Sequence, residues 1–477
     1  MPTAAGPERG WLRPVALLVA VVCALRLAAL ALNRTDVFVD EAQYWLWGQR
    51  LDLGYYSKPP LIGWLLRAVS EIAGDAPFWL RAPGVLLHGA TALVLGALAA
   101  RLAGRAAALW AAGLYLSTPF VTMGGLFIST DTVMAPFYAG AILMFWRTAE
   151  TRGAGAALAT GALAGLAFLA KYAAIYLILS AGLVALLIPA LRPGWRNAAL
   201  MALCFALVIS PNVAWNLGHQ LATVSHTADN IGWVREGAAL GLASLAEFLG
   251  AQFLVFGPVA MAALLWGFAR PRGGARLALV LFAAPPLIAV SVQALLGKAY
   301  ANWAVATYFA GTVLAVLVLP RAGRIAAVAV NAVISLAMIA LTVTLPWPEI
   351  NGQPLLQRHT GRADLSRQIL GLALAEGVPV LAENRDILAD LFYTGRDRGV
   401  TIYAPRPQGR AANYYEESFP LPADFTGKLL VIRDRAPECN GAPVPPAAIF
   451  TKRGTWAKKG AGLTPYVLDA GCLNAAD

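Results

Sequence analysis

The sequence predicts an α-helical protein that crosses a membrane many times and ends in a small soluble domain. Two observations predict this architecture. Of the 477 residues, 58% are hydrophobic and only 13% are charged, whereas a soluble domain is about 45–50% apolar and about a quarter charged. The apolar residues also recur in runs of about 20, the length of a helix that crosses a bilayer. A soluble globular protein, intrinsic disorder and a fibrous repeat are therefore excluded.

The distribution of charge predicts the orientation of the spans. The formal charge is +11, but the segment from Pro346 onward has 15 Lys+Arg against 14 Asp+Glu, so nearly all of the excess lies before it. Arginine-rich connectors usually face the cytoplasm, and here they alternate, which places the N-terminus in the cytoplasm and the C-terminal domain on the other side. The eleven expected spans are 14–33, 82–100, 106–123, 132–146, 155–170, 173–190, 197–212, 243–268, 277–296, 303–319 and 325–345.

The membrane domain is expected to cover residues 1–345 and the soluble domain residues 346–477. In the soluble part, short β-branched runs alternate with a helical segment, which indicates a small α/β domain. The stretches that show this pattern are 378–395, 400–405 and 428–434.

Two of the four cysteines, Cys439 and Cys472, fall in the soluble domain. A compartment outside the cytoplasm permits disulfides, so a Cys439–Cys472 disulfide is one hypothesis. The alternative is a pair of unlinked cysteines that serve as small hydrophobic residues.

The first outer loop, residues 34–81, combines acids, aromatic rings and a lysine. Asp40 and Glu41 open a helical stretch, whose first turn favours carboxylates even without any chemical role. The rings have two explanations, because side chains that anchor a loop at a membrane interface can also stack against a sugar. Three of the rings are candidate substrate contacts: Tyr44, Tyr55 and Tyr56.

Lys58 is the candidate lipid-phosphate ligand of this loop. Pro59 and Pro60 follow it and hold its backbone extended. Its ammonium group is a compact charge that suits a phosphate, although an ordinary lysine that extends to the membrane surface is the alternative. Three further cations are phosphate candidates: Lys171, Arg81 and Lys298.

Asp131 is the second outer-facing acid, in the segment FISTDTVMAP. The same segment can simply cap a helix, but an ionisable group at membrane depth indicates function by default. A carboxylate can act as a general base, and a cation can stabilise a departing phosphate. The remaining polar candidates for substrate contact on this side are Asn216, His226 and Asn302.

Several kinds of site are missing from the sequence. It has no phosphate-binding GxxxxGK[ST] loop, no dinucleotide fingerprint and no HExxH or CxxC pattern. His219 and His226 are seven residues apart and have no clear third ligand, so they do not predict a metal site. We therefore expect no cofactor, no metal site and no nucleic-acid partner, and a requirement for a divalent cation stays open.

The segment DEAQYWLWGQRLDLGYYSKPPLIGWLLR resembles the first periplasmic loop of bacterial membrane glycosyltransferases of the GT-C fold. The resemblance is closest to the group related to protein O-mannosyltransferases and to the lipid A aminoarabinose transferase. It extends in order over about residues 15–320. The further segments that carry it are STD at 129–131, AKY at 170–172, PNVAWN at 211–216 and ANW around 302–303.

The resemblance implies transfer of a sugar from a polyprenyl-phosphate carrier to an acceptor, with inversion, at the periplasmic face of the bacterial inner membrane. It implies that Asp40 is the general base or orients the acceptor, with Glu41 as its acidic neighbour. Asp131 corresponds to a second acidic position and Lys58 to the ligand of the lipid phosphate. Ser57 stands where the aminoarabinose branch commonly has an acid, which disfavours that substrate.

Acceptors of this group include lipid A, lipopolysaccharide, cell-wall glycan and protein, and the expected partners are the donor, the acceptor and membrane lipid. Two other functions compete with glycosyl transfer. A transporter or flippase of lipid-linked sugars needs the same polyprenyl-phosphate site, but transport sites usually lie near the bilayer midplane, whereas these charges cluster at one face. A scaffold whose tail binds a partner does not require acids and lysines in the short outer connectors.

Overall fold

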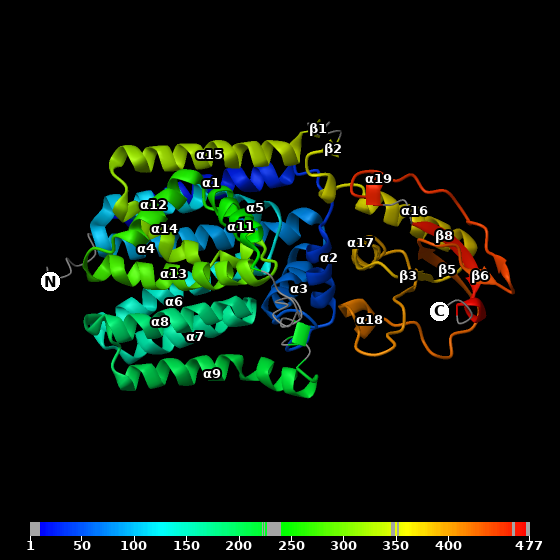
Figure 1. Cartoon of the computed structure of the whole chain (residues 1–477), viewed down its shortest axis with the longest axis horizontal. Helices are drawn as coiled ribbons and strands as arrows, with labels where there is room; N and C mark the ends of the chain where they lie inside the picture. The colour runs from blue at the N-terminus through cyan, green and yellow to red at the C-terminus, as the bar shows by residue number, and fades with distance from the viewer. Residues whose placement is uncertain are drawn as a thin grey trace. The chain divides into compact units, whose positions relative to one another are not determined.

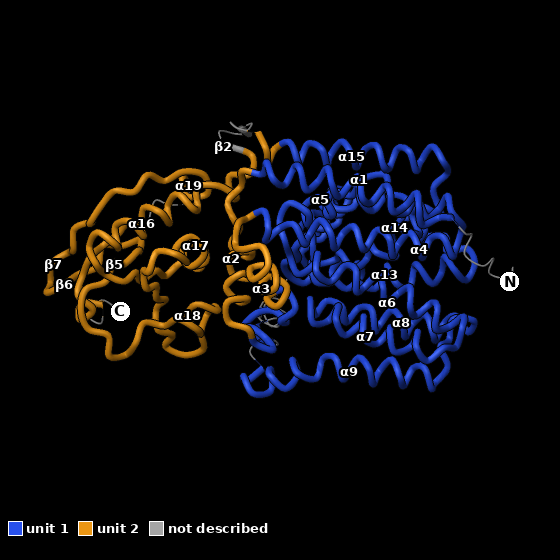
Figure 2. Tube along the Cα trace, turned by 180° about the vertical axis from the view of Figure 1, so that it is seen from behind, with its two compact units in different colours: residues 1–33, 52–62, 78–340 blue, residues 34–51, 63–77, 341–477 orange. Residues whose placement is uncertain are grey.

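The computed structural model describes residues 10–221, 223, 225–226, 240–344, 349–350, 353–459 and 463–473. The chain forms two compact units (Figure 2). Unit 1 comprises residues 1–33, 52–62 and 78–340, and unit 2 comprises residues 34–51, 63–77 and 341–477. The first outer loop is thus divided, since two of its stretches belong to the C-terminal unit. The expected domain boundary at 345/346 lies outside the described residues.

Unit 1 is a bundle of helices that run roughly along one direction (Figure 1). Helix α7 packs between α6 and α9, and α13 contacts α8, α11 and α14. The helices are α1 (Leu12–Ala31), α4 (Pro77–Ser117), α5 (Pro119–Leu126), α6 (Thr130–Thr151), α7 (Ala154–Ala170), α8 (Ile175–Leu187), α9 (Trp195–Gly218), α11 (Leu242–Val255), α12 (Pro258–Ala269), α13 (Gly273–Leu296), α14 (Thr307–Val318) and α15 (Arg321–Val343), with short turns η1 (Tyr172–Ala174), η2 (Pro189–Leu191) and η3 (Ala301–Ala304).

Among the described helices, five are long and apolar enough to cross a membrane, and six if a bent pair counts as one span. The five are α1, α4, α9, α13 and α15. Each of the eleven expected spans contains a helix, but several of these helices are short. The number of membrane crossings therefore stays a prediction.

Two expected spans are not continuous helices, which corrects the sequence-based assignment. The span 243–268 is broken into α11 and α12, bent by 115°. The break falls at Gly257, whose φ of 94° suits glycine, and at Pro258, which cannot continue the helical hydrogen bonds. The span 106–123 is interrupted after Ser117, and α5 starts at Pro119. Helix α4 itself leaves helical geometry at Ala103 and Gly104.

A buried arginine supplies hydrogen bonds at the interruption between α4 and α5. Arg26 of α1 is only 9% exposed. Its guanidinium donates to the carbonyl oxygen of Leu116 and, at 2.8 Å, to the hydroxyl of Thr122. The carbonyls at the end of a helix have no partner within that helix, so a charged donor from a neighbouring helix stabilises the interruption inside an apolar bundle.

Unit 2 is built on a four-stranded sheet in the order β4-β3-β5-β8. Strand β3 is parallel to β4 and β5, with Val380 paired to Ile402 and Leu430, and β8 is antiparallel to β5. The central strand β5 is buried at four consecutive positions, as expected for a strand covered on both faces. The main elements are α2 (Val39–Gln49), α3 (Leu61–Ala73), α16 (Arg362–Glu376), β3 (Val380–Ala382), α17 (Arg385–Thr394), β4 (Ile402–Tyr403), α18 (Tyr414–Ser418), β5 (Lys428–Arg433) and β8 (Thr464–Asp469).

Smaller elements complete unit 2. The hairpins pair β1 (Glu349–Ile350) with β2 (Gln353–Pro354) and β6 (Glu438–Cys439) with β7 (Ala442–Pro443). Short helical turns are η4 (Gln357–His359), α19 (Trp456–Lys459) and η6 (Ala470–Cys472). Cys439 and Cys472 form a disulfide with a Cα–Cα distance of 5.1 Å. The bond ties the β6–β7 hairpin to the end of β8, beside the core residues Leu429 and Val431.

Candidate active site

Helix α2 carries both acids of the first loop and gives them different environments. Glu41 is 2% exposed, and its Oε2 accepts the backbone N–H of Phe38 at 2.9 Å. It therefore closes the start of the helix, as a glutamate at the third helical position often does. The side chain of Asp40 is 49% exposed and faces an arginine. Asp40 is thus the accessible acid, and Glu41 is a structural one.

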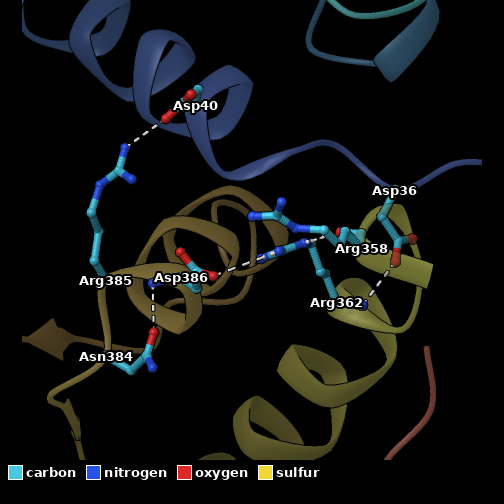
Figure 3. A network of polar contacts seen from close by, with 7 residues as sticks. All are labelled: Asp36, Asp40, Arg358, Arg362, Asn384, Arg385 and Asp386. Atoms are coloured by element: carbon cyan, nitrogen blue, oxygen red, sulfur yellow. Dashed lines mark hydrogen bonds and ion pairs between the residues drawn. The ribbon is translucent and has the colours of Figure 1, made fainter. Parts of the chain in front are cut away.

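The arginine beside Asp40 is Arg385, from the C-terminal part of the same unit (Figure 3). Its Nη2 donates to Asp40 Oδ1 at 2.7 Å. Its Nε and Nη2 also donate to Oε1 of Gln43, at 2.9 and 2.7 Å. Asp40 and Gln43 lie three residues apart on one face of α2, so a single guanidinium reaches both. Sequence analysis did not single out Arg385 or Gln43.

Local structure explains the position of Arg385. It is the first residue of α17, which follows β3 after a two-residue connection. Asn384 caps this helix by accepting the backbone N–H of Asp386 at 2.8 Å. Burial lowers the pKa of Arg385, but the Asp40 carboxylate raises it, and the net pKa lies above its ordinary value. Arg385 therefore stays protonated.

Further contacts hold α2 against the rest of unit 2. Before the helix, Asp36 Oδ2 accepts the backbone N–H of Arg362 at 2.8 Å, at the start of α16 (Figure 3). Later in α2, the indole N–H of Trp45 donates to Asp75 at 2.7 Å, and the hydroxyl of Tyr393 donates to the Asp75 carbonyl at 2.5 Å. Asp40 thus belongs to a helix that is fixed at both ends.

A second acid–cation pair lies in unit 1. Lys171 Nζ is 2.6 Å from Asp131 Oδ1, and each side chain is 13% exposed. The amide of Asn302 donates to the other carboxylate oxygen at 3.0 Å. Ser129 takes the capping role in this segment by accepting the Thr132 N–H at 3.3 Å. The structure thus brings three predicted site residues together, and in this arrangement Asp131 and Lys171 neutralise each other.

A polar chain next to this pair reaches the first loop. The hydroxyl of Tyr172 donates to Asn212 Oδ1 at 2.8 Å and accepts from Asn216 at 3.2 Å. Asn212 in turn donates to the carbonyl of Leu53 at 2.7 Å. Only Asn216 was among the predicted site residues. The available signals for the others were the four-residue spacing of two asparagines on one helix face and the position of Tyr172 directly after Lys171.

Lys58 sits at the end of a tight turn in the same unit. The backbone N–H of Tyr55 donates to the Lys58 carbonyl at 3.1 Å, and Thr223 donates to the Tyr55 carbonyl at 2.8 Å. The ring of Tyr56 lies 5.0 Å from that of His226. Tyr55 and Tyr56 are 3% and 6% exposed. The turn is therefore anchored by its aromatic residues, while Lys58 is only half-buried.

The other predicted residues lie apart from these groups. Arg81 is fully buried, with its guanidinium 5.0 Å from the Phe127 ring centre. Lys298 is exposed and lies 4.9 Å from the ring centre of Tyr300. Tyr44 is 5% exposed and packs on Trp47 with the ring centres 5.2 Å apart. Across the residues that the structure describes, no cluster of three or more His, Cys, Asp or Glu side chains fits a metal ion.

Comparison with known proteins gives these sites a context. The profile of the family described as dolichyl-phosphate-mannose-protein mannosyltransferase matches residues 57–215. A lipid A galacturonosyltransferase, RgtD from Rhizobium johnstonii, is 40% identical over 461 residues, which cover 94% of this chain and 96% of the relative.

Solved structures show the same fold. ArnT from Cupriavidus metallidurans in the apo state has a TM-score of 0.62 at 15% identity, covering 89% of this chain and 93% of that one. The same protein bound to undecaprenyl phosphate has a TM-score of 0.64 at 16% identity, covering 98% and 99%.

The fold and the acidic first-loop helix define a membrane glycosyltransferase of the GT-C type, integral to the inner membrane. The chain belongs to the family that contains the Rhizobium lipid A galacturonosyltransferase. The resemblance found in the sequence is confirmed.

Proposed function

We propose that this enzyme transfers a galacturonosyl residue from a polyprenyl-phosphate donor to lipid A at the periplasmic face of the membrane. The sugar and the acceptor are inferred from the relative that is 40% identical over nearly its whole length, a lipid A galacturonosyltransferase. The donor class is inferred from the first-loop motif and from the ArnT structure that holds undecaprenyl phosphate.

One observation carries the proposed chemistry: the state of Asp40. One of its oxygens is held by Arg385 at 2.7 Å, and within the described part of the chain no other group bonds the carboxylate. The second oxygen is thus able to accept a proton, and the side chain is half exposed. A general base must reach the proton that it removes. Among the predicted acids, Asp40 is bonded at one oxygen only within the described residues, whereas Glu41 caps a helix and Asp131 is bonded at both oxygens.

The proposed reaction is a single displacement. Asp40 takes the proton of an acceptor hydroxyl, and the acceptor oxygen forms a bond to the anomeric carbon. The bond between that carbon and the phosphate oxygen breaks, and polyprenyl phosphate leaves with the electron pair, so the anomeric configuration inverts. Lys58 stabilises the charge on the departing phosphate, as a preorganised cation does in a water-poor site. Lys171 is assigned a lesser role because Asp131 already neutralises it.

The test is glycosyl transfer by the purified protein in detergent, with polyprenyl-phosphate galacturonic acid and lipid A, followed by mass analysis. Asp40→Asn removes the base but keeps the shape of the side chain, so we expect transfer to fall by about 10²- to 10⁴-fold. Asp364→Asn is the matched control, because Asp364 is also 49% exposed and paired with an arginine in unit 2. It should retain full activity.

The same assay separates the competing functions. In detergent no membrane has to be crossed, so a transporter or a scaffold would yield no glycosylated product. Panels of other polyprenyl-phosphate sugars, and of lipopolysaccharide, cell-wall glycan and protein acceptors, define specificity. Undiminished transfer by Asp40→Asn would falsify the role of Asp40, and transfer of a different sugar would remove the galacturonosyl assignment alone.

A further inference from the structure

We propose that Arg385 is a positioning residue for Asp40, so that the C-terminal segment of unit 2, residues 341–477, contributes directly to the catalytic centre. This inference rests on the proposed function, because it assigns to Arg385 the task of orienting the base. The residue belongs to the soluble tail, separated from Asp40 by 345 positions in sequence. It lies outside the first-loop motif.

The first argument is geometric. Arg385 makes three hydrogen bonds to two side chains of α2, one to Asp40 and two to Gln43. The planar guanidinium has its donors in fixed directions, so Gln43 fixes the plane that Asp40 then meets. Gln43 is 3% exposed and provides an immobile anchor. The result is that Asp40 Oδ1 is held while Oδ2 is left for the substrate.

The second argument concerns the support of Arg385 itself. It starts α17 directly after strand β3, and α17 packs against α2. The carboxyl ends of parallel strands commonly place functional side chains in α/β folds. Asn384 fixes the start of the helix with its cap. Arg385 therefore extends from a rigid sheet and a capped helix, which suits a residue that must hold another in place.

The third argument concerns the cost of a misplaced base. Misplacing a reacting group by about 1 Å costs up to about 100-fold in rate. The Arg385 and Asp40 side chains are 40% and 49% exposed, and solvent screens the attraction within such pairs strongly. The contribution of Arg385 is therefore expected to come from orientation.

The experiment compares Arg385→Ala, Arg385→Lys and Arg367→Ala in the full-length protein, in the same transfer assay. We expect Arg385→Ala to lower kcat by roughly 10- to 100-fold with the donor KM within about twofold of wild type. Arg385→Lys should keep part of the activity, because one bond to Asp40 can form. Arg367→Ala is the control, since Arg367 pairs with Asp364 on the same unit at similar exposure.

Chemical rescue distinguishes positioning from a structural role. Because the native side chain is partly exposed, millimolar guanidinium should restore part of the kcat of Arg385→Ala. It should not restore Asp40→Asn, which lacks the base. Wild-type kcat in Arg385→Ala overturns the inference, and so does a loss that follows reduced thermal stability and is not rescued. A wild-type protein that transfers nothing overturns the proposed function and this inference together.

Discussion

The Asp131–Lys171 pair and the Asp40–Arg385 pair differ in burial and in how completely the acid is bonded. In unit 1, Asp131 is held at both oxygens, by Lys171 and Asn302, and the ion pair is 13% exposed on each side. In unit 2, Asp40 is held at one oxygen by Arg385, and the side chains are 49% and 40% exposed.

An acid that is largely covered and bonded at both oxygens is poorly placed to accept a proton from a substrate. Removing one partner of such an ion pair leaves the other charge without compensation, so the pair is costly to break. A partly exposed acid with one oxygen bonded keeps its orientation and still has an acceptor site. We therefore expect the loss of Lys171 to affect mainly stability, and the loss of Arg385 to affect mainly the proposed chemistry at Asp40.

The largest expected effect on stability comes from Lys171→Met, which is compared with Arg385→Met. Lys171→Met leaves the largely covered Asp131 with Asn302 but without a cation. We expect it to lower the free energy of unfolding by about 3 kcal/mol, the lower end of the range for a buried pair. Arg385→Met breaks an exposed pair, worth about 1 kcal/mol or less. It also leaves Oε1 of the buried Gln43 without its donor, so we expect a total cost of about 1–2 kcal/mol. The measurement is the unfolding midpoint of each purified variant in a mixed-detergent titration. Equal losses at the two sites would end the distinction between them.

A third carboxylate tests burial without a close ion pair. Asp390 of α17 is 3% exposed. Burial raises its pKa to about 6 from 3.8, and the negative charge of Asp36 adds to this rise, whereas the hydrogen bonds of Ser366 and Thr394 and the charge of Arg362 oppose it. The folded state then binds a proton more tightly than the unfolded chain, so this group makes unit 2 more stable as pH falls from about 6 to about 4. Above pH 6 its ionised form lowers stability.

Asp390→Asn should remove that dependence. A pKa difference of about two units corresponds to about 3 kcal/mol, so we expect the variant to be more stable than wild type by about 2–3 kcal/mol above pH 7, with no gain near pH 4. Thermal unfolding of the full-length protein at several pH values measures this. Asp364→Asn, on the exposed face of α16, serves as the control and should not give this gain in stability above pH 7. An unaltered profile in Asp390→Asn would contradict the assignment.

Local patterns in the sequence predicted much of this molecule. Apolar runs located the helices of unit 1, and the first-loop motif pointed to Asp40 and Lys58. The Gly-Pro pair at 257–258 indicated a break, but the apolar residues on both sides of it also fit a single continuous span, so the bend between α11 and α12 was not predicted. Asp40 and Glu41 were indistinguishable by position alone, because neighbouring helical residues differ by about 100° in direction and the sequence does not say which side is covered.

Arg385 was beyond sequence reasoning for a different reason. Its partner lies 345 residues away, and no periodicity links a loop near the start of a chain to a helix near its end. The local signal was limited to a polar ENRD segment directly after a predicted strand. That signal indicates a strand end and a helix cap, and the fold of unit 2 decides what the arginine meets.

The smallest expected effect tests whether the chain of hydrogen bonds beside Asp131 supports the loop that holds Lys58. Tyr172→Phe removes the hydroxyl shared by Asn212 and Asn216, which are 2% and 6% exposed. Leaving buried polar groups without a partner costs about 1–3 kcal/mol. Asn212 also holds the Leu53 carbonyl, so its freed side chain should loosen the turn.

We therefore expect a loss of about 1–2 kcal/mol for Tyr172→Phe, together with a higher KM for the donor and little change in kcat. Tyr138→Phe is the matched control, because the hydroxyl of this buried tyrosine has no hydrogen-bond partner among the described residues. Its removal should cost nothing. If both variants behave alike, the polar chain does not position the loop. A raised KM in Tyr172→Phe alone would support a role of this polar chain in holding the turn that carries Lys58.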